Sequence, residues 1–284
     1  MLPDVLAALR CPLCRGALTV GERGLRCGSG HAFDVARQGY VSFLVGRPSG
    51  LVGDDAAMVD ARARFLAAGH FDPLAEALAA AAAEATAGAG AGLVVDVGAG
   101  TGWYLARVLD ATPARAGLAV DLSKFAARRA ARAHPRAVAA VADARAPLPL
   151  ADGCAAVALD VFAPRNGPEL RRILRDDGLL LVVTPAREHL DELRQVLGLL
   201  DVDPEKERRV ADALSPCFDR VASEPRRWRM RLPRGDVLAL AGMGPSARHV
   251  GTEALAARAA PLPDPVEVTG AVVVERWRPR PSPP

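Results

Sequence analysis

Residues 93–102 read Leu-Val-Val-Asp-Val-Gly-Ala-Gly-Thr-Gly, and this stretch decides the fold that the sequence predicts. The apolar run Leu93–Val97 is typical of a buried parallel strand, and the glycines after it form a loop that leads into a helix. Strand, glycine loop and helix are the first unit of a Rossmann-like sheet. A dinucleotide-binding fingerprint starting at Gly98 would need a third glycine where the chain has Trp103, and no Gly-Lys-Ser/Thr follows for a phosphate loop. The stretch therefore disfavours NAD and nucleoside triphosphates as ligands.

Aspartates at the ends of three successive predicted strands extend this unit: Asp96, Asp121 and Asp143. The run from Asp96 to Gly102 resembles the first motif of the class I S-adenosylmethionine-dependent methyltransferases. In that motif, glycines such as Gly98 and Gly100 let the backbone approach the methionine part of the cofactor. The resemblance implies that the first acid faces the ammonium group of the cofactor, the second binds the ribose hydroxyls and the third contacts the adenine amino group. Taken singly, each aspartate could instead cap a helix.

A cysteine motif near the amino terminus predicts a second site. Cys11 and Cys14 form one short knuckle, Cys27 and His31 form another, and about a dozen residues separate the two, which is the spacing of a tetrahedral Cys₃His zinc site. A segment this small cannot bury enough apolar surface to fold alone, so the metal would supply its folding free energy. Four protein ligands leave no open position for a substrate, which favours a structural zinc ion. A disulfide is the weaker alternative in a reducing cytosol.

The composition is that of a globular chain with one large domain and a small addition. Hydrophobic residues make up 50% of the 284 residues, and 36 basic against 33 acidic side chains give a net charge of +3. All but two of the basic residues are arginines, which suit phosphate and guanine, although a codon bias is the simpler explanation.

No apolar run is long enough to span a membrane, and Asp4 lies where a secretory signal would be positively charged. We therefore expect a cytoplasmic protein without membrane contact. Cys154 and Cys217 lack a partner motif and are expected to be small buried hydrophobes.

The rest of the chain alternates between strands and helices. A helical stretch at 54–87 precedes the first strand, and later elements are predicted as strands at 154–162 and 179–184, helices at 168–175 and 188–200, and an antiparallel pair at 227–232 and 266–277. The alternation predicts an α/β fold, with a doubly wound, mostly parallel sheet and helices on both faces. The expected domains are a zinc-finger module at 1–46, a linker with helices that pack on the cofactor pocket at 47–92, and the Rossmann-like domain at 93–284.

Further segments carry a closer resemblance. Outside the cysteine motif and the glycine loop they are Phe33–Val41, Gly53-Asp54, Ala61-Arg62, Ala68–Phe71, Asp121–Lys124, Phe162–Pro164, Thr184-Pro185 and Met243–Pro245. With these segments the chain resembles, over nearly its whole length, the zinc-finger 23S rRNA guanine-N1-methyltransferases. Phe33–Val41, Ala130–Arg136 and Val161–Asn166 resemble the Gram-positive branch that includes the tylosin-resistance methyltransferases.

This resemblance implies S-adenosylmethionine-dependent methylation of N1 of guanine 748, in the helix 35 hairpin loop of 23S rRNA, and resistance to tylosin-type macrolides. Guanine 745 is an alternative target. Dimerisation is also expected from the family. Its cofactor contacts map onto Phe71, Thr101, Gly102 and His189, and its zinc ligands onto Cys11, Cys14, Cys27 and His31. The family often has tyrosine in place of Phe71, so a hydroxyl interaction is missing here.

The chemistry adds candidates of its own. Guanine N1 carries a proton, so methyl transfer needs a base. Asp160 is the first candidate because it is predicted to end the fourth strand beside the pocket; Asp54 and Asp55 follow, and each could equally be a cap or an ion-pair partner. A target guanine must leave its loop to reach a buried methyl donor. The candidate pocket walls are Trp103, Tyr104, Phe162 and Pro164. The candidate phosphate contacts, which could equally be solvated helix faces, are Arg107, Arg128, Arg129, Arg132 and Arg165.

Two other functions use part of these features. A methyltransferase acting on a small molecule would need the glycine loop but has little use for a zinc finger. A zinc-containing RNA-binding protein without enzymatic activity would keep the finger but not three cofactor-facing acids. The combination favours the rRNA methyltransferase.

Overall fold

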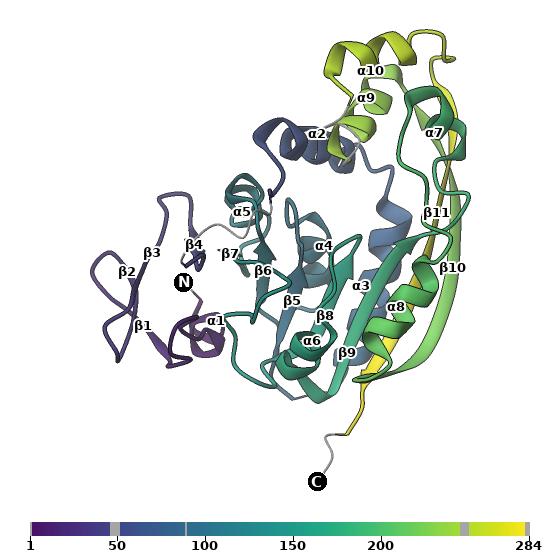
Figure 1. The fold of residues 1–284 in the computed structure, drawn as a ribbon. Helices are drawn as coiled ribbons and strands as arrows, with labels where there is room; N and C mark the ends of the chain where they lie inside the picture. The colour runs from purple at the N-terminus through teal and green to yellow at the C-terminus, as the bar shows by residue number, and fades with distance from the viewer. Residues whose placement is uncertain (1, 46–51, 89, 245–249, 282–284) are drawn as a thin grey trace.

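A mostly parallel sheet of eight strands forms the centre of the computed structural model, which describes residues 2–45, 52–88, 90–244 and 250–281 (Figure 1). The strand order is β10-β11-β9-β8-β5-β6-β7-β4. In that order the strands are Phe218–Leu232, Val266–Pro279, Leu174–Pro185, Ala155–Val161, Leu93–Val97, Gly117–Asp121, Ala137–Val141 and Tyr40–Ser42. All neighbours from β9 to β4 are parallel, and β11 runs antiparallel to both β9 and β10.

The strand order reverses between β5 and β8. From β5 the chain steps outward through β6 and β7, then returns to place β8 on the other side of β5. Open α/β sheets bind ligands at such a reversal, outside the carboxyl ends of the two strands. The predicted Rossmann-like, doubly wound architecture is confirmed, and it places the glycine loop after β5 beside the turn after β8.

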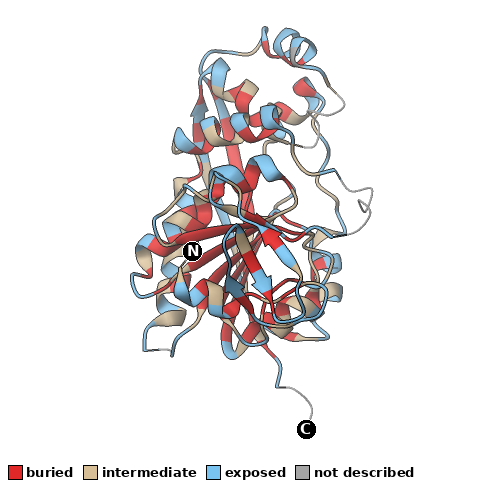
Figure 2. Ribbon diagram, turned by 90° about the vertical axis from the view of Figure 1, so that its left-hand side faces the viewer, coloured by how far each residue is buried: buried red, intermediate tan, exposed pale blue. Residues whose placement is uncertain are grey.

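Helices cover both faces of the sheet. The helices on one face are α3 (Asp72–Thr86), α4 (Trp103–Ala111) and α5 (Lys124–Ala130). Those on the other are α1 (Pro3–Ala8), α6 (Gly167–Ile173) and α8 (Lys206–Leu214). Figure 2 shows the central strands as a buried layer between them. Uninterrupted runs of Val, Leu and Ala in these strands are what a sheet covered on both faces requires.

Four further helices, here called the cap helices, lie above the carboxyl ends of the strands (Figure 1). They are α2 (Ala56–Ala67), α7 (Asp191–Leu197), α9 (Arg234–Met243) and α10 (Thr252–Ala259). α2 packs on α9, and α10 contacts both α9 and α7. The helical stretch expected at 54–87 is two helices, α2 and α3, because Gly69 adopts a φ of +80° and turns the chain between them.

Two later elements differ in extent from the prediction. The antiparallel pair is confirmed, but β10 already begins at Phe218 and pairs with β11 along its whole length. Residues 176–178, which separate the predicted helix at 168–175 from the predicted strand at 179–184, are an irregularity within β9, where the pairing with β8 passes from Leu174 directly to Leu179. Arg175 and Asp177 form an ion pair there, with 2.7 Å between Nε and Oδ1. In the described ranges, no helix has the length and apolar character needed to cross a membrane.

The amino-terminal residues form a small sheet that is joined to the large one. β1 (Leu18–Val20), β2 (Gly24–Cys27) and β3 (Ala32–Asp34) make an antiparallel sheet of three strands. β4 leaves this module and extends the central sheet by pairing in parallel with β7. The guanidinium of Arg15 donates to the backbone oxygens of Leu148 and Leu150, at 2.7 Å each, and so ties the module to the segment after β7. The predicted domain boundary at 46/47 lies outside the described residues.

Candidate functional site

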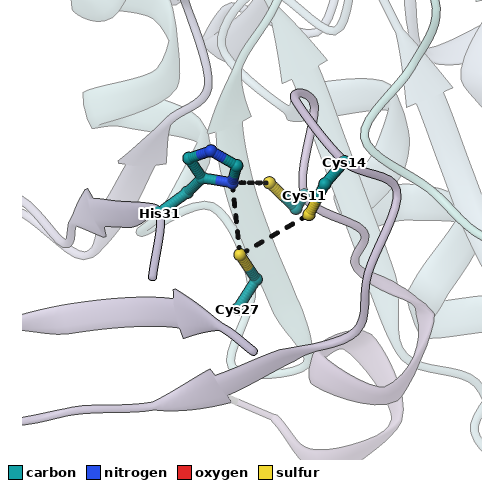
Figure 3. A group of neighbouring side chains, drawn as sticks. All are labelled: Cys11, Cys14, Cys27 and His31. Carbon is teal, nitrogen blue, oxygen red and sulfur yellow. Dashed lines mark hydrogen bonds between the residues drawn. The ribbon is translucent and has the colours of Figure 1, made fainter. Parts of the chain in front are cut away.

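The four predicted zinc ligands converge on one point (Figure 3). Cys11 and Cys14 lie in the loop after α1, and Cys27 and His31 lie at the end of β2 and in the turn before β3. The Nδ1 atom of His31 is 3.4 Å from the sulfurs of both Cys11 and Cys27, and the sulfurs of Cys14 and Cys27 are 3.6 Å apart. All four donor atoms lie within 4.8 Å of one another. Two local knuckles thus form a single cluster.

This cluster fits a zinc ion. Tetrahedral zinc with Zn–S bonds of about 2.3 Å and Zn–N bonds of about 2.0 Å places its ligand atoms about 3.3–3.8 Å apart, and the three distances given above fall in that range. Hydrogen bonds from Ser29, the backbone of Gly16 and His31 lower the pKa of the Cys14 thiol to about 6, which favours the thiolate that binds metal. Three thiolates and one imidazole leave no place for a substrate, so the ion is structural.

The second site is a cavity between the carboxyl ends of the strands and the cap helices. Its volume is about 440 Å³. The floor consists of Asp96 at the end of β5 and of the glycine loop, where Gly98 and Gly100 adopt φ angles of +75° and +54°. A side chain is strained at these angles, and a β-carbon on Gly98 would lie 2.5 Å from that of Ala163. The loop needs glycine for its conformation as well as for space.

Asp121 fixes the glycine loop from the neighbouring strand end. Its two carboxylate oxygens accept hydrogen bonds of 2.8 Å, one from the backbone N–H of Gly100 and one from that of Ser123. Each oxygen keeps a lone pair for a further donor, as contact with ribose hydroxyls requires. The strand-end aspartate therefore shapes the loop in addition to the role that the sequence predicted.

Asp96 is the least solvated acid of the cavity. It is 1% exposed, and its Oδ2 atom has no hydrogen-bond partner. Burial, together with the negative charges of Asp121 and Asp160, raises the pKa of Asp96 to about 8. A buried acceptor without a partner is costly, so this oxygen fits a cation or donor that enters the cavity. The ammonium group of S-adenosylmethionine is such a cation, and it would supply the hydrogen-bond donor and the positive charge that Oδ2 of Asp96 lacks.

Aromatic side chains form one wall of the cavity. Phe71 is 2% exposed, and its ring centroid lies 6.5 Å from that of Phe162 and 6.1 Å from that of His189. The backbone N–H of Ala271 donates to Nδ1 of His189 over 3.1 Å, so the neutral ring carries its proton on Nε2. Burial and the charge of Arg194 lower the pKa of His189 to about 4. At neutral pH His189 is therefore a hydrogen-bond donor and not a base.

The remaining predicted cofactor residues surround the cavity without lining it. Thr101 lines an adjacent groove between α2, α4 and α5, and Gly102 begins α4 with a φ of +75°. Asp143 follows β7 as expected and accepts a 2.9 Å hydrogen bond from the backbone of Arg145. The structure thus brings Phe71, Asp96, Gly98, Gly100 and His189 together in the cavity lining, and leaves Thr101, Gly102, Asp121 and Asp143 beyond it.

Asp160, the predicted base, is fully buried at the end of β8. Its carboxylate lies 3.2 Å from Nη2 of Arg165, and it is not among the described residues that line the cavity. Burial raises the pKa of Asp160 to about 7, although the charges of Arg165 and Lys206 oppose the shift. Such a pKa suits a general base at neutral pH, but Arg165 lies beside the carboxylate. Asp160 as the base stays a prediction.

Arg62 on α2 lines the cavity, although the sequence alone assigned it no role. Its guanidinium pairs with Asp54 over 2.6 Å, donates to the backbone oxygen of Met243 over 2.9 Å and lies 3.1 Å from the position of a β-carbon on Gly100. It therefore brings a positive charge over the glycine loop from the cap. Ala61-Arg62 belongs to the segments that carry the family resemblance, which was the one signal in the sequence.

Strand order, glycine loop and zinc cluster together define a zinc-containing methyltransferase of class I. Residues 9–45 match the zinc-ribbon family described as "RlmA, N-terminal". A 23S rRNA (guanine(748)-N(1))-methyltransferase of Streptomyces fradiae is 52% identical, over 99% of this chain and all of that one. A proposed 23S rRNA (guanine-N(1)-)-methyltransferase of Micromonospora griseorubida is 56% identical, over 98% of this chain and all of that one.

More distant relatives follow. YxjB of Bacillus subtilis, also a proposed 23S rRNA (guanine-N(1)-)-methyltransferase, is 37% identical over 66% of this chain and 68% of its own. A solved S-adenosylmethionine-dependent methyltransferase of Geobacter sulfurreducens, in complex with S-adenosyl-L-homocysteine, is 17% identical with a TM-score of 0.44, over 72% of this chain and 90% of that one. With its two full-length relatives, the chain belongs to the 23S rRNA (guanine-N1)-methyltransferase family. It is an enzyme that uses S-adenosylmethionine and carries zinc.

Proposed function

We propose that this enzyme methylates N1 of guanine 748 in 23S rRNA, and that the target lies in a hairpin loop. The observation that carries the proposal is the full-length identity of 52% with the Streptomyces fradiae enzyme, whose name specifies guanine 748. The zinc cluster supports an RNA substrate over a small molecule, because a small substrate gives a methyltransferase little use for such a module. The rRNA substrate also implies a cytoplasmic enzyme.

In this proposal S-adenosylmethionine lies along the edge of the sheet above β5, β6 and β7. Asp96 faces the ammonium group, and Gly98 and Gly100 receive the methionine part, with Phe71 and His189 as the opposite wall. The adenosine part extends toward Asp121, Asp143, Thr101 and Gly102. Cys11, Cys14, Cys27 and His31 hold the zinc ion.

The protein has two tasks in the reaction. When bound, S-adenosylmethionine would supply a methyl group on a sulfonium; the C–S bond would break as N1 bonds to the methyl carbon, and S-adenosylhomocysteine would leave. The first task of the protein is therefore to hold guanine N1 about 3 Å from the methyl carbon. The second is to remove the N1 proton, for which Asp160 is the proposed base. His189 keeps its proton on Nε2, because its Nδ1 accepts a hydrogen bond from the backbone of Ala271. It can therefore donate a hydrogen bond to the bound cofactor.

The test is a methylation assay with radiolabelled S-adenosylmethionine on three substrates: bare 23S rRNA, assembled large subunits and a set of small metabolites. We expect label in rRNA and a primer-extension stop at guanine 748, because methylated N1 cannot form a Watson–Crick pair. A stop at guanine 745 would reassign the target. Label only in metabolites, or in no fraction, would contradict the proposal.

Two finer expectations belong to the same proposal. Expression in a sensitive host should raise the tylosin concentration that stops growth, and an enzyme carrying Gly100→Arg should leave it unchanged. A homodimer, which would give the RNA a wider contact surface, is expected in solution. Light scattering at the mass of one chain of 29.7 kDa would contradict the dimer.

A further inference from the structure

Phe162 is an exposed aromatic residue in the lining of the cavity. Its exposure is 42%, although it directly follows the fully buried β8. An exposed phenylalanine costs hydrophobic free energy. Phe162 is among the candidate pocket walls, but neither the relatives nor the family's cofactor contacts assign its ring a specific partner.

The backbone of Phe162 is held in a conformation that phenylalanine avoids. Its φ is +56°, in the left-handed region, and its N–H donates to the backbone oxygen of Val183 over 3.1 Å. Below it, the buried Asp160–Arg165 ion pair joins the two ends of the turn. Strained residues fixed in this way concentrate at functional sites, where the strain serves to aim a side chain.

The turn places the ring in the lining of the cavity, which Gly98 and Gly100 also line. One side of the ring packs against the buried wall: its centroid is 6.1 Å from that of His189, with 29° between the planes, and 6.5 Å from that of Phe71. Ala163, the next residue, is in contact with the glycine loop at Gly98. The residue next to Phe162 in the chain thus touches the glycine loop, and Phe162 itself stays nearly half exposed.

We infer that Phe162 is the platform on which the target guanine stacks when it enters the cavity. A base that has left its loop needs a flat apolar partner, and aromatic side chains supply this in single-stranded RNA recognition. Phe162 is a positioning residue in this scheme: its ring sets the plane of the base, so that N1 points at the methyl group. The inference rests on the proposed rRNA substrate.

The test compares Phe162→Asn, Phe162→Tyr and Val221→Asn. Asparagine tolerates the left-handed backbone and removes the ring, so the turn is expected to keep its shape. Tyrosine retains the ring. Val221 on β10 is the control, because it is an apolar residue that is 55% exposed and lies outside the cavity and the adjacent groove.

For Phe162→Asn we expect kcat/KM on a 23S rRNA hairpin transcript to fall about 5- to 150-fold, the range for loss of one base–aromatic stack. Affinity for S-adenosylhomocysteine, measured by calorimetry, should stay within about twofold. A transcript with 2-aminopurine at the target position should show fluorescence quenching with the wild type and less with this variant. Phe162→Tyr and Val221→Asn should behave like the wild type.

Three results would overturn the inference: an unchanged rate for Phe162→Asn, an equal loss of S-adenosylhomocysteine affinity, or a Phe162→Tyr variant as slow as Phe162→Asn. The second would assign the ring to the cofactor. If the wild-type enzyme left the transcript, bare 23S rRNA and large subunits all unmethylated, the proposed function would fail, and the quenching measurement would still decide whether the base stacks on Phe162.

Discussion

The zinc cluster and the proposed cofactor cavity are each suited to one small ligand, but the chain builds them differently. The zinc ligands come from two knuckles within residues 11–31, and their donor atoms converge within 4.8 Å. The cavity draws on strand ends, a turn and cap helices from residue 62 to residue 244. A site made of local turns depends on its ligand to stay folded, whereas a site made by a large sheet exists before its ligand arrives. Damage to one should therefore leave the other largely intact.

The largest effect that separates the two sites is expected from Gly100→Arg. The new side chain would fill the cavity floor, collide with Arg62 and force a non-glycine residue to a φ of +54°. We predict that binding of S-adenosylhomocysteine falls below detection in calorimetry while the zinc content stays at one ion per chain. Loss of zinc, or retained affinity for S-adenosylhomocysteine, would contradict the prediction that the two sites are independent.

The converse change is Cys14→Ser, which removes one thiolate from the cluster. We predict that zinc binding weakens about 100-fold or more, as judged by competition with a chelator, and that rRNA methylation falls with it. Affinity for S-adenosylhomocysteine should change less than about threefold. Cys154→Ser is the matched control, since this cysteine lies outside the cluster. Unchanged metal content in Cys14→Ser would refute the ligand assignment.

A smaller, pH-dependent effect is expected from Asp96→Asn. Because the pKa of Asp96 is raised to about 8 in the folded protein, the folded state holds a proton that the unfolded state releases above about pH 4. Wild-type stability without cofactor should therefore fall by about 1 kcal/mol per pH unit between pH 4 and pH 8, and the asparagine variant should lack this slope.

Thermal unfolding from pH 5 to pH 8 measures the difference between the two proteins. The free energy of unfolding of Asp96→Asn should increase relative to that of the wild type as the pH rises. The variant should also bind S-adenosylhomocysteine more weakly than the wild type. Asp143→Asn, a strand-end aspartate outside the cavity lining, is the control and should leave the slope in place. A parallel pH dependence in wild type and Asp96→Asn would show that Asp96 is ionised in the free enzyme.

The smallest effect concerns the link between the two regions. Arg15→Ala removes the two hydrogen bonds to Leu148 and Leu150. Since the Arg15 side chain is 40% exposed, we expect the variant to lose only about 1 kcal/mol of stability. rRNA methylation should fall a few-fold, with zinc and cofactor affinities unchanged. The exposed Arg26, changed to alanine, is the control. Hydrogen exchange in β1 to β3 should accelerate in the first variant alone.

The same contrast explains what the sequence could predict. The zinc ligands form a short motif that its spacing identifies, the alternation of strands and helices predicts the α/β architecture, and the glycine loop is recognised by its resemblance to the first methyltransferase motif. The role of Arg62 depends on α2 folding back over β5, where it meets Met243 from the far end of the chain. The left-handed backbone of Phe162 also has no signal in the residue type. Contacts between distant segments and strained backbone angles are set by tertiary structure, which one sequence does not reveal.

The contact between Gly98 and Ala163 has a consequence for how the enzyme tolerates change. The glycine loop and the turn that carries Phe162 touch at this pair, where one methyl group added to Gly98 would clash. In the proposed scheme the loop receives the methyl donor and the turn positions its acceptor, so the two segments cannot shift independently. A larger side chain at Ala163 would displace the turn without adding an atom to the glycine loop, and we expect such variants to keep their cofactor affinity and to transfer the methyl group slowly.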